Sequence, residues 1–356
     1  MSMWFITQAC ALRQRWAAVA FLLGSLALSA CGVNATAQVK PTATAGPVVR
    51  VAVTIHLAEP SGGSHPIANG LWFAGGERSL YEVDPATNII VASVLAPDGA
   101  GEYLAAAGSL WVSLDGRIVR LDPTSGRVLA TIPLAGVRGD GARMAADATS
   151  LWVGVTYGDT LARIDLKTSQ LIKVIPIDAT PTSVAIADGS VWVCAHHSLH
   201  AQPALWRIDP TTYKTLATID TTEGQGFQCG GVNADANGAI WVGNVQEIQE
   251  KHDLLRIDPA TNRVVATAAI DGQPSDVAAD PNSVWVVDPT RSVVIRYDAQ
   301  SDQLIGVSAP LTVGGPSNQE VPGHIWEADG ALWVQSFTST NLPYPGPTVW
   351  RLQIAG

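Results

Sequence analysis

The sequence predicts an all-β protein, a seven-bladed β-propeller, and three observations lead to that prediction. A segment built around tryptophan recurs seven times along the 356 residues. A second segment containing an Arg or Glu and an Asp follows each of the first six tryptophans at a similar distance. Turn-forming residues separate these segments, and the chain holds 33 Gly and 22 Pro. Short strands at regular spacing with turn residues between them are typical of repeated β-folds.

The first thirty residues are predicted to be an export signal and no part of the fold. Arg13 and Arg15 precede the apolar run 16–28, and small residues follow it. That order is typical of a cleaved signal peptide, and the run is short for a membrane span. We therefore assign 1–30 as a signal peptide.

The end of the signal, "LSAC" at 28–31, resembles the lipobox of bacterial lipoproteins. The resemblance implies lipidation of Cys31, since two acyl chains on one cysteine are enough for stable anchoring. An ordinary signal peptide followed by a chance cysteine is the alternative. Residues 31–47 carry the lipidated cysteine and a flexible tether that is small, Pro-containing and aperiodic.

Seven tryptophans mark the second strand of seven repeated units. Each lies between hydrophobic residues, as in "ADGSVWV" (187–193), and follows a tight turn. The seven are Trp72, Trp111, Trp152, Trp192, Trp241, Trp285 and Trp333. Their spacings of 39, 41, 40, 49, 44 and 48 residues suit one four-stranded propeller blade per unit.

The third and fourth strands of each unit are predicted in the segment that trails the tryptophan. Examples are "LYEVDPATNIIVASV" at 80–94 and "LLRIDPATNRVVATA" at 254–268. Asp followed by Pro suits the first two positions of a type I turn, and a Val- and Ile-rich strand follows it.

The ring is predicted to close through its two ends. The seventh unit stops at "TVWRLQIAG" (348–356), after its third strand. The segment "VVRVAVTIHL" (48–57) is similar to the fourth strands of the other units. We expect it to complete the last blade, which removes an open sheet edge. The propeller then spans residues 48–356.

The chain resembles the YVTN/NHL-type propellers of secreted bacterial proteins, and more distantly the virginiamycin B lyase-like propellers. The segments "ADGSVWV", "LLRIDPATNRVVATA" and "PTSVAIADGSVWV" (181–193) carry this resemblance. It implies the propeller fold over about 48–356. It implies little about function, because one fold hosts many activities.

A polar channel mouth is the first candidate site. The position nine residues before each tryptophan falls on the innermost strand and carries Glu102, Arg143, Ser183, Asp276 and His324. Blade five offers Gln228 to Gly231 there, and blade one offers His65 nearby. We expect a ligand-binding pocket, with Trp326 and Phe227 as apolar contacts. The alternative is a solvated mouth whose charges pair with one another.

The run "CAHHSLH" (194–200) is a second candidate. A disulfide between Cys194 and Cys229 is expected in an exported protein. Two free buried thiols are one alternative. A metal site that includes His196 and His200 is another, because imidazole and thiolate both suit zinc and copper.

The lyase resemblance implies a third reading, in which a His base, a Glu and Mg²⁺ act at the channel mouth. The candidates for these roles are His324, Glu320 and Glu102. However, the tryptophan segments here end in "WVGN", "WVVD" and "WVQS" and lack the "WFTE"-like ending of that family. The family's catalytic residues therefore cannot be carried over position by position.

Charge and composition set the expected function class. The net charge is −10 with a pI near 5.1, and no basic stripe is present, which argues against nucleic acid. We expect a monomeric, extracytoplasmic binding module held to a bacterial membrane by its lipid alone. The expected partner is a cell-envelope protein, peptide or glycan, and no cofactor is expected. A metal-dependent lyase or hydrolase and a purely structural scaffold are the alternatives.

Overall fold

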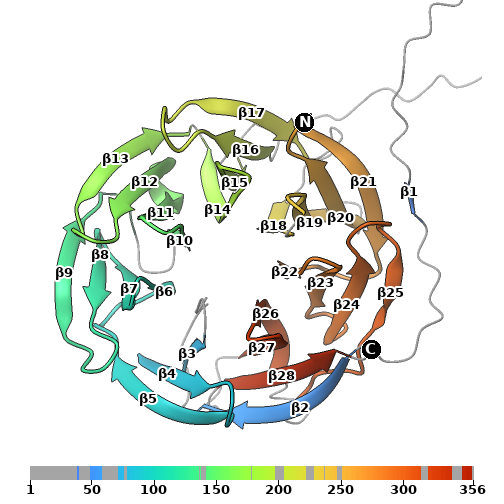
Figure 1. The fold of residues 1–356 in the computed structure, drawn as a ribbon, viewed down its shortest axis with the longest axis horizontal. Helices are drawn as coiled ribbons and strands as arrows, with labels where there is room; N and C mark the ends of the chain where they lie inside the picture. Colours follow the sequence, from blue (N-terminus) through green and yellow to red (C-terminus); the bar gives the residue numbers. More distant parts are fainter. Residues whose placement is uncertain are drawn as a thin grey trace, which may run out of the picture. The chain divides into compact units, whose positions relative to one another are not determined.

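The computed structural model describes thirteen stretches of the chain: 38–39, 49–57, 71–75, 78–135, 137, 142–177, 179–196, 204–221, 228–235, 237–246, 251–313, 320–338 and 347–354. Residues 36–356 form one compact unit, and residues 1–35 lie outside the described residues. The larger unit consists of seven β-sheets arranged around a central axis (Figure 1). The predicted seven-bladed propeller is confirmed.

Each blade is an antiparallel sheet whose strands follow chain order from the centre of the ring outward. Blade 1 shows β3 (Trp72–Ala74), β4 (Ser79–Asp84) and β5 (Ile89–Leu95) among the described residues. Blade 2 contains β6 (Tyr103–Ala106), β7 (Ser109–Leu114), β8 (Arg117–Leu121) and β9 (Val128–Pro133). Blade 3 contains β10 (Ala142–Ala146), β11 (Ser150–Val155), β12 (Thr160–Asp165) and β13 (Leu171–Pro176), with a short 3₁₀ turn, η1 (Thr156–Gly158), after β11.

The remaining blades repeat this order. Blade 4 contains β14 (Thr180–Ala187), β15 (Ser190–His196), β16 (Ala204–Ile208) and β17 (Thr215–Asp220). Blade 5 contains β18 (Gln228–Ala234), β19 (Ile240–Gln246), β20 (Lys251–Asp258) and β21 (Arg263–Ile270). Blade 6 contains β22 (Asp276–Ala279), β23 (Ser283–Asp288), β24 (Val293–Asp298) and β25 (Leu304–Val307), and blade 7 contains β26 (Glu320–Ala328), β27 (Ala331–Thr338) and β28 (Thr348–Ile354).

The N-terminal strand closes the ring as predicted. β2 (Val49–His56) pairs antiparallel with β28, from Val49 opposite Ile354 to His56 opposite Thr348, and becomes the outermost strand of blade 7. A two-residue strand, β1 (Gln38–Val39), pairs parallel with the outer strand of blade 5. Within the described residues, no helix is long and apolar enough to cross a membrane.

The core lies between neighbouring blades. Six of the seven repeated tryptophans are almost fully buried, and each second strand is buried on both faces because it lies in the middle of the ring wall. Trp111 of blade 2, for example, packs in one cluster with Leu151 and Val153 of blade 3. Burial of such large rings supplies much of the hydrophobic stabilisation of each boundary. In outer strands such as β9 most residues are exposed, and Ile132 is the buried one in β9.

The Asp that begins each turn between the third and fourth strands organises that turn. Asp122 accepts backbone hydrogen bonds from Thr124 and Ser125 at 3.0 and 2.8 Å. The Ser125 backbone bond is the main cause that lowers the pKa of Asp122. This local bonding explains why the Asp recurs in six units of the sequence.

Candidate functional site at the channel mouth

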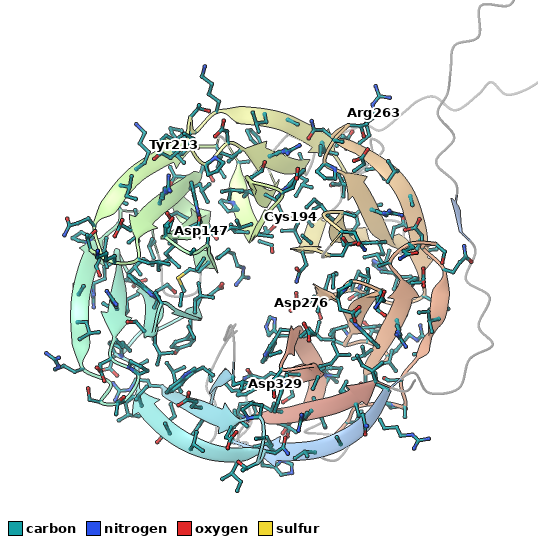
Figure 2. The ribbon with its side chains drawn as sticks, viewed as in Figure 1. Asp147, Cys194, Tyr213, Arg263, Asp276 and Asp329 are labelled. Atoms are coloured by element: carbon teal, nitrogen blue, oxygen red, sulfur yellow. A yellow bond between two sulfur atoms is a disulfide. The ribbon has the colours of Figure 1, made fainter. Side chains whose placement is uncertain are left out.

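The innermost strands bring the predicted polar residues to one level of the ring. Arg143 lies on β10, Ser183 on β14, Asp276 on β22 and His324 on β26, and Glu102 directly precedes β6. Figure 2 shows Asp276 at the inner edge of its blade, toward the ring centre. We call these five residues the mouth residues.

Glu102 and Arg143 form an ion pair across the boundary between blades 2 and 3. Arg143 Nη1 lies 2.8 Å from Glu102 Oε2, and the backbone N–H of Met144 donates to Glu102 Oε1 at 3.0 Å. The Glu102 side chain is buried, whereas that of Arg143 is 28% exposed. Burial raises the pKa of Glu102, and the Arg143 guanidinium opposes this effect.

Asp276 and His324 form a second pair, across the boundary between blades 6 and 7. His324 Nδ1 lies 3.5 Å from Asp276 Oδ2, and the two side chains are 15% and 24% exposed. Asp276 Oδ2 also accepts the backbone N–H of Ile325 at 3.1 Å, and Oδ1 accepts that of Val277 at 2.9 Å. The Asp276 carboxylate is therefore fixed by three groups, two of them on blade 7.

Polar side chains at the level of the mouth residues also connect neighbouring blades. Five successive boundaries, from blades 2 and 3 to blades 6 and 7, each carry at least one hydrogen bond between an inner-strand side chain and the backbone of the following blade. The five bonds join Glu102 to Met144 N, Arg143 to Thr182 O, Ser183 to Val232 N, Asn233 to Val277 O and Asp276 to Ile325 N. The recurrence of polar residues at this level thus has a structural cause.

Asn233 is the blade 5 member of this set, and the sequence alignment missed it. Its Nδ2 donates to the carbonyl of Val277 at 3.1 Å. The predicted positions, Gln228 to Gly231, lie earlier on β18, where the pairing with β19 shifts between Cys229 and Gly231. Asn233 lies eight residues before Trp241. The other members of the set lie nine residues before their tryptophan, so Asn233 is one residue away from the predicted position.

The structure does not bring Glu320 and His324 to a common site. The pairing of β26 with β27 shifts between Pro322 and His324, so the two side chains lie on opposite faces of the blade. Glu320 is fully buried and accepts from Ser336 Oγ and from the backbone N–H of Thr348. Among the residues that the structure describes, no group of three or more His, Cys, Asp or Glu side chains suits a metal ion. Because Glu320 and His324 lie on opposite faces of the blade, Glu320, His324 and Glu102 cannot together hold the Mg²⁺ that the lyase resemblance implies.

Cys194 and Cys229 are joined in a disulfide, with their Cα atoms 5.6 Å apart. The bond connects β15 of blade 4 to β18 of blade 5, next to the mouth. Thr182 Oγ1 donates to the carbonyls of both cysteines at 3.3 Å. The bond and these contacts fix the backbone on which Ser183 lies.

Several predicted residues lie outside the described part of the chain: Cys31, His65, His200 and Phe227, as well as the side chain of His196. Trp326 is described, and its ring packs 5.3 Å from that of Phe73 at the boundary between blades 7 and 1.

Comparison with known proteins supports the fold independently. Residues 138–343 match the family model described as SMP-30/Gluconolactonase/LRE-like region. The β-propeller domain of Cps50 (Swd1) from Myceliophteria thermophila is 12% identical with a TM-score of 0.61, and 85% of this chain and 99% of that chain align. The WD40 domain of Neurospora crassa Pan2 is 9% identical with a TM-score of 0.62, over 87% and 97% of the two chains. No curated protein matches the chain significantly.

Proposed function

The chain belongs to the family described as SMP-30/Gluconolactonase/LRE-like region, and we propose that it acts as a binding module whose ligand docks at the channel mouth. In this proposal the propeller is exported and held to a bacterial membrane by a lipid on Cys31. Its ligand is a peptide or glycan of the cell envelope.

One observation carries the proposal. The Glu102–Arg143 ion pair and the Asp276–His324 contact place charged and polar groups at one level of the ring, and three of the four side chains keep a partly exposed surface. Backbone N–H groups of the following blades hold both carboxylates in place. Because these groups are fixed before a ligand arrives, binding loses little side-chain entropy.

The same contacts favour binding over chemistry. A carboxylate that acts as a general base needs an oxygen that is free to accept a proton from the substrate. Glu102 and Asp276 instead accept hydrogen bonds from Met144, Arg143 and Ile325. Removal of either carboxylate would therefore disturb a blade boundary as well as the mouth.

Lactone hydrolysis is the second candidate function. The family description includes gluconolactonase, and His324 beside Asp276 is an imidazole oriented by a carboxylate, an arrangement that suits a general base. A sugar lactone would be its substrate class.

A binding experiment on residues 32–356 separates the two functions. The probe is a muropeptide, which combines a disaccharide with a short peptide. We expect it to raise the melting temperature, because a ligand at one hundred times its Kd adds about 2.7 kcal/mol. The Arg143→Lys variant should lose at least tenfold in affinity, since Lys cannot form the same planar contacts.

Arg263→Lys is the matched control, because Arg263 is exposed on the outer rim of blade 5 (Figure 2). It should bind like the wild type. Absence of a shift, together with hydrolysis of an aldonolactone that His324→Ala abolishes, would replace the binding proposal with the hydrolase. Equal binding by Arg143→Lys and wild type would place the ligand away from the mouth.

A further inference from the structure

Blade 1 departs from the other six blades at one position. In six blades an Arg on the third strand faces the repeated tryptophan, with its guanidinium carbon 4.9–5.7 Å from the ring centroid. The cross-strand partner of Trp72 in blade 1 is Glu82. A carboxylate therefore occupies the position that a guanidinium holds elsewhere.

The guanidinium does more than stack, because it also bonds to the next blade. Arg163 Nη1 donates to the Pro210 carbonyl at 2.8 Å and lies 3.3 Å from the Tyr213 hydroxyl. Arg207 donates in the same way to the Pro259 carbonyl and, at 2.9 Å, to Asn262 Oδ1. The accepting carbonyl in both cases follows the Asp that begins the turn.

The accepting side chains share an unusual backbone conformation. Five residues receive an Arg from the neighbouring blade, and all five have a positive φ between 55° and 60°: Asn88, Ser169, Tyr213, Asn262 and Asp302. A left-handed position favours glycine. These five turns keep a polar side chain there, and its contact with the incoming Arg gives the reason.

Blade 2 has no such side chain. The equivalent position in its turn is Gly126, with φ of 68°. The boundary between blades 1 and 2 therefore lacks both the donor, because Glu82 replaces Arg, and the accepting side chain. These two differences from the other blades lie 44 residues apart in sequence and meet at one boundary.

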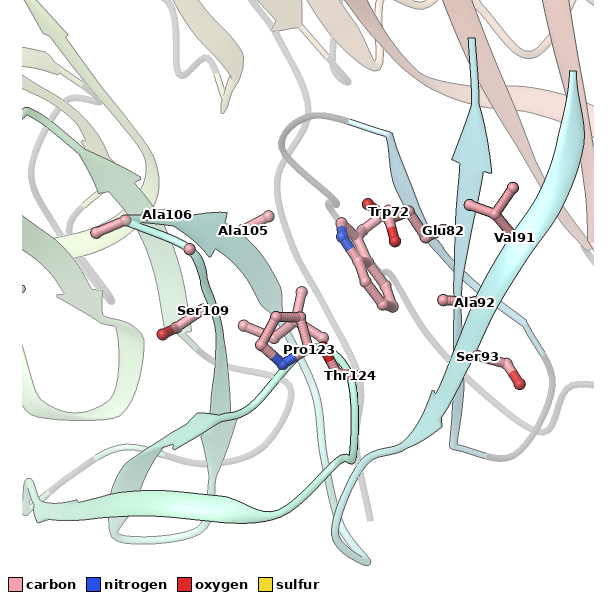
Figure 3. Close-up of a pocket in the computed structure, with 13 residues that line it drawn as sticks. Trp72, Glu82, Val91, Ala92, Ser93, Ala105, Ala106, Ser109, Pro123 and Thr124 are labelled. Carbon is pink, nitrogen blue, oxygen red and sulfur yellow. The ribbon is translucent and has the colours of Figure 1, made fainter. Parts of the chain in front are cut away.

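A cavity of about 890 Å³ occupies this boundary. Trp72 and Glu82 of blade 1 form one wall, and Ser109 and Pro123 of blade 2 lie across from them (Figure 3). The small residues Ala105–Gly108 widen it on the blade 2 side. Among the described residues, none forms a hydrogen bond or an ion pair with the Glu82 carboxylate.

We propose that this cavity binds a guanidinium group from another molecule, an arginine side chain of a partner polypeptide. The ring of Trp72 offers the stacking face, Glu82 offers a carboxylate for a charge-assisted pair, and the Pro123 carbonyl lies where Pro210 and Pro259 accept an Arg. Guanidinium suits this set better than ammonium, because it is planar and combines stacking with in-plane donors. No mouth residue lines the cavity, so this site is separate from the proposed function.

The test is calorimetric titration of the folded protein with Nα-acetylarginine methylamide. The uncharged analogue built on citrulline has nearly the same shape and should bind at least tenfold more weakly. The Glu82→Gln variant should lose a similar factor for the arginine probe. Equal binding of the two probes would overturn the proposal, because the carboxylate would then contribute nothing.

A second variant fills the cavity from within. Glu82→Arg restores the arrangement of the other six blades, so it should raise the melting temperature and abolish binding of the arginine probe. Glu327→Arg, at an exposed acidic position on β26, is the matched control and should bind the probe like the wild type. Undiminished binding by Glu82→Arg would overturn the proposed location.

The guanidinium could come from an arginine side chain of a polypeptide or from the free amino acid, and a titration with free arginine distinguishes the two. Free arginine carries an α-ammonium and an α-carboxylate, and binding would remove water from both charges where the blocked form has neutral amides. We therefore expect free arginine to bind several-fold more weakly than the blocked form, which mimics a residue within a polypeptide. Tighter binding of free arginine would contradict the polypeptide partner and assign the cavity to the amino acid.

Discussion

Individual polar residues of the inner strands serve two purposes. Glu102, Arg143 and Asp276 each bond to the backbone of the following blade, and they also carry the charges of the mouth. A residue with both roles cannot change without affecting the fold. The sequence also allowed a mouth whose charges pair with one another. Such pairing is present, and it joins residues of adjacent blades.

Glu102 should make stability depend on pH in a defined direction. Burial raises the pKa of Glu102 above its usual value of 4.5, so the folded state binds this proton more tightly than the unfolded state. The free energy of unfolding contributed by the group is present below about pH 4.5 and is lost as pH rises through the folded pKa. Relative to Glu102→Gln, the wild type should therefore lose stability as the pH rises above about 4.5.

Urea unfolding of both proteins at several pH values measures this difference. Glu327→Gln, at an exposed position, should show no trend and serves as the control. A difference that grows in favour of the wild type as pH rises would mean that Arg143 lowers the Glu102 pKa by more than burial raises it.

At the scale of elements, side chains of one blade bond to the turn or inner strand of the next. The Arg on the third strand covers its own tryptophan and bonds to the next blade's turn, and the inner strand repeats this connection near the axis. β2 is the element on which closure depends, because it comes from the opposite end of the chain from β28. Val49, Ile55 and Leu57 of this segment are buried.

Removal of β2 should open the ring. We compare a chain that starts at residue 48 with one that starts at residue 58. Three buried apolar side chains contribute about 1.5–3 kcal/mol each, which is comparable to the total stability of a domain. The shorter chain should melt at least 10 °C lower or aggregate through the exposed edge of β28.

Addition of the peptide 48–57 should restore part of the lost melting temperature. Equal melting of the two truncated chains would mean that blade 7 is stable with three strands. Circular dichroism during heating gives both results.

At the scale of the whole molecule, the proposed lipid anchor would hold the propeller at the membrane and so limit its ligands to those present there. The proposed lipid on Cys31 predicts that the expressed protein sediments with membranes. The Cys31→Ser variant should remain in the soluble fraction, because it lacks the two acyl chains that stable lipid anchoring needs.

Cys10→Ser is the matched control and should stay with the membrane, since Cys10 precedes the apolar run. Mass spectrometry of the mature protein checks the lipid itself, as an N-terminal mass that includes acyl chains. Membrane association of Cys31→Ser equal to that of the wild type would contradict lipid anchoring.

The sequence by itself determined the number of blades, the closing strand and the level of the polar residues. These features repeat, and each follows from local rules: a buried tryptophan, an Asp-led turn and alternation along a strand. Even the departure of blade 1 is visible in the sequence, since "LYEVDP" carries Glu82 where other units carry Arg.

The tertiary structure decided what these residues do. Hydrogen bonds between blades join positions about 40–50 residues apart, and no local pattern reveals which backbone atom a side chain will reach. The register shift after Pro322 places Glu320 and His324 on opposite faces, although their spacing in an unbroken strand would place them on one. Glu82 lies in blade 1 and Gly126 in blade 2, and their two departures from the repeat meet only at the boundary between these blades. The sequence does not reveal the cavity there, because residues of both blades line it.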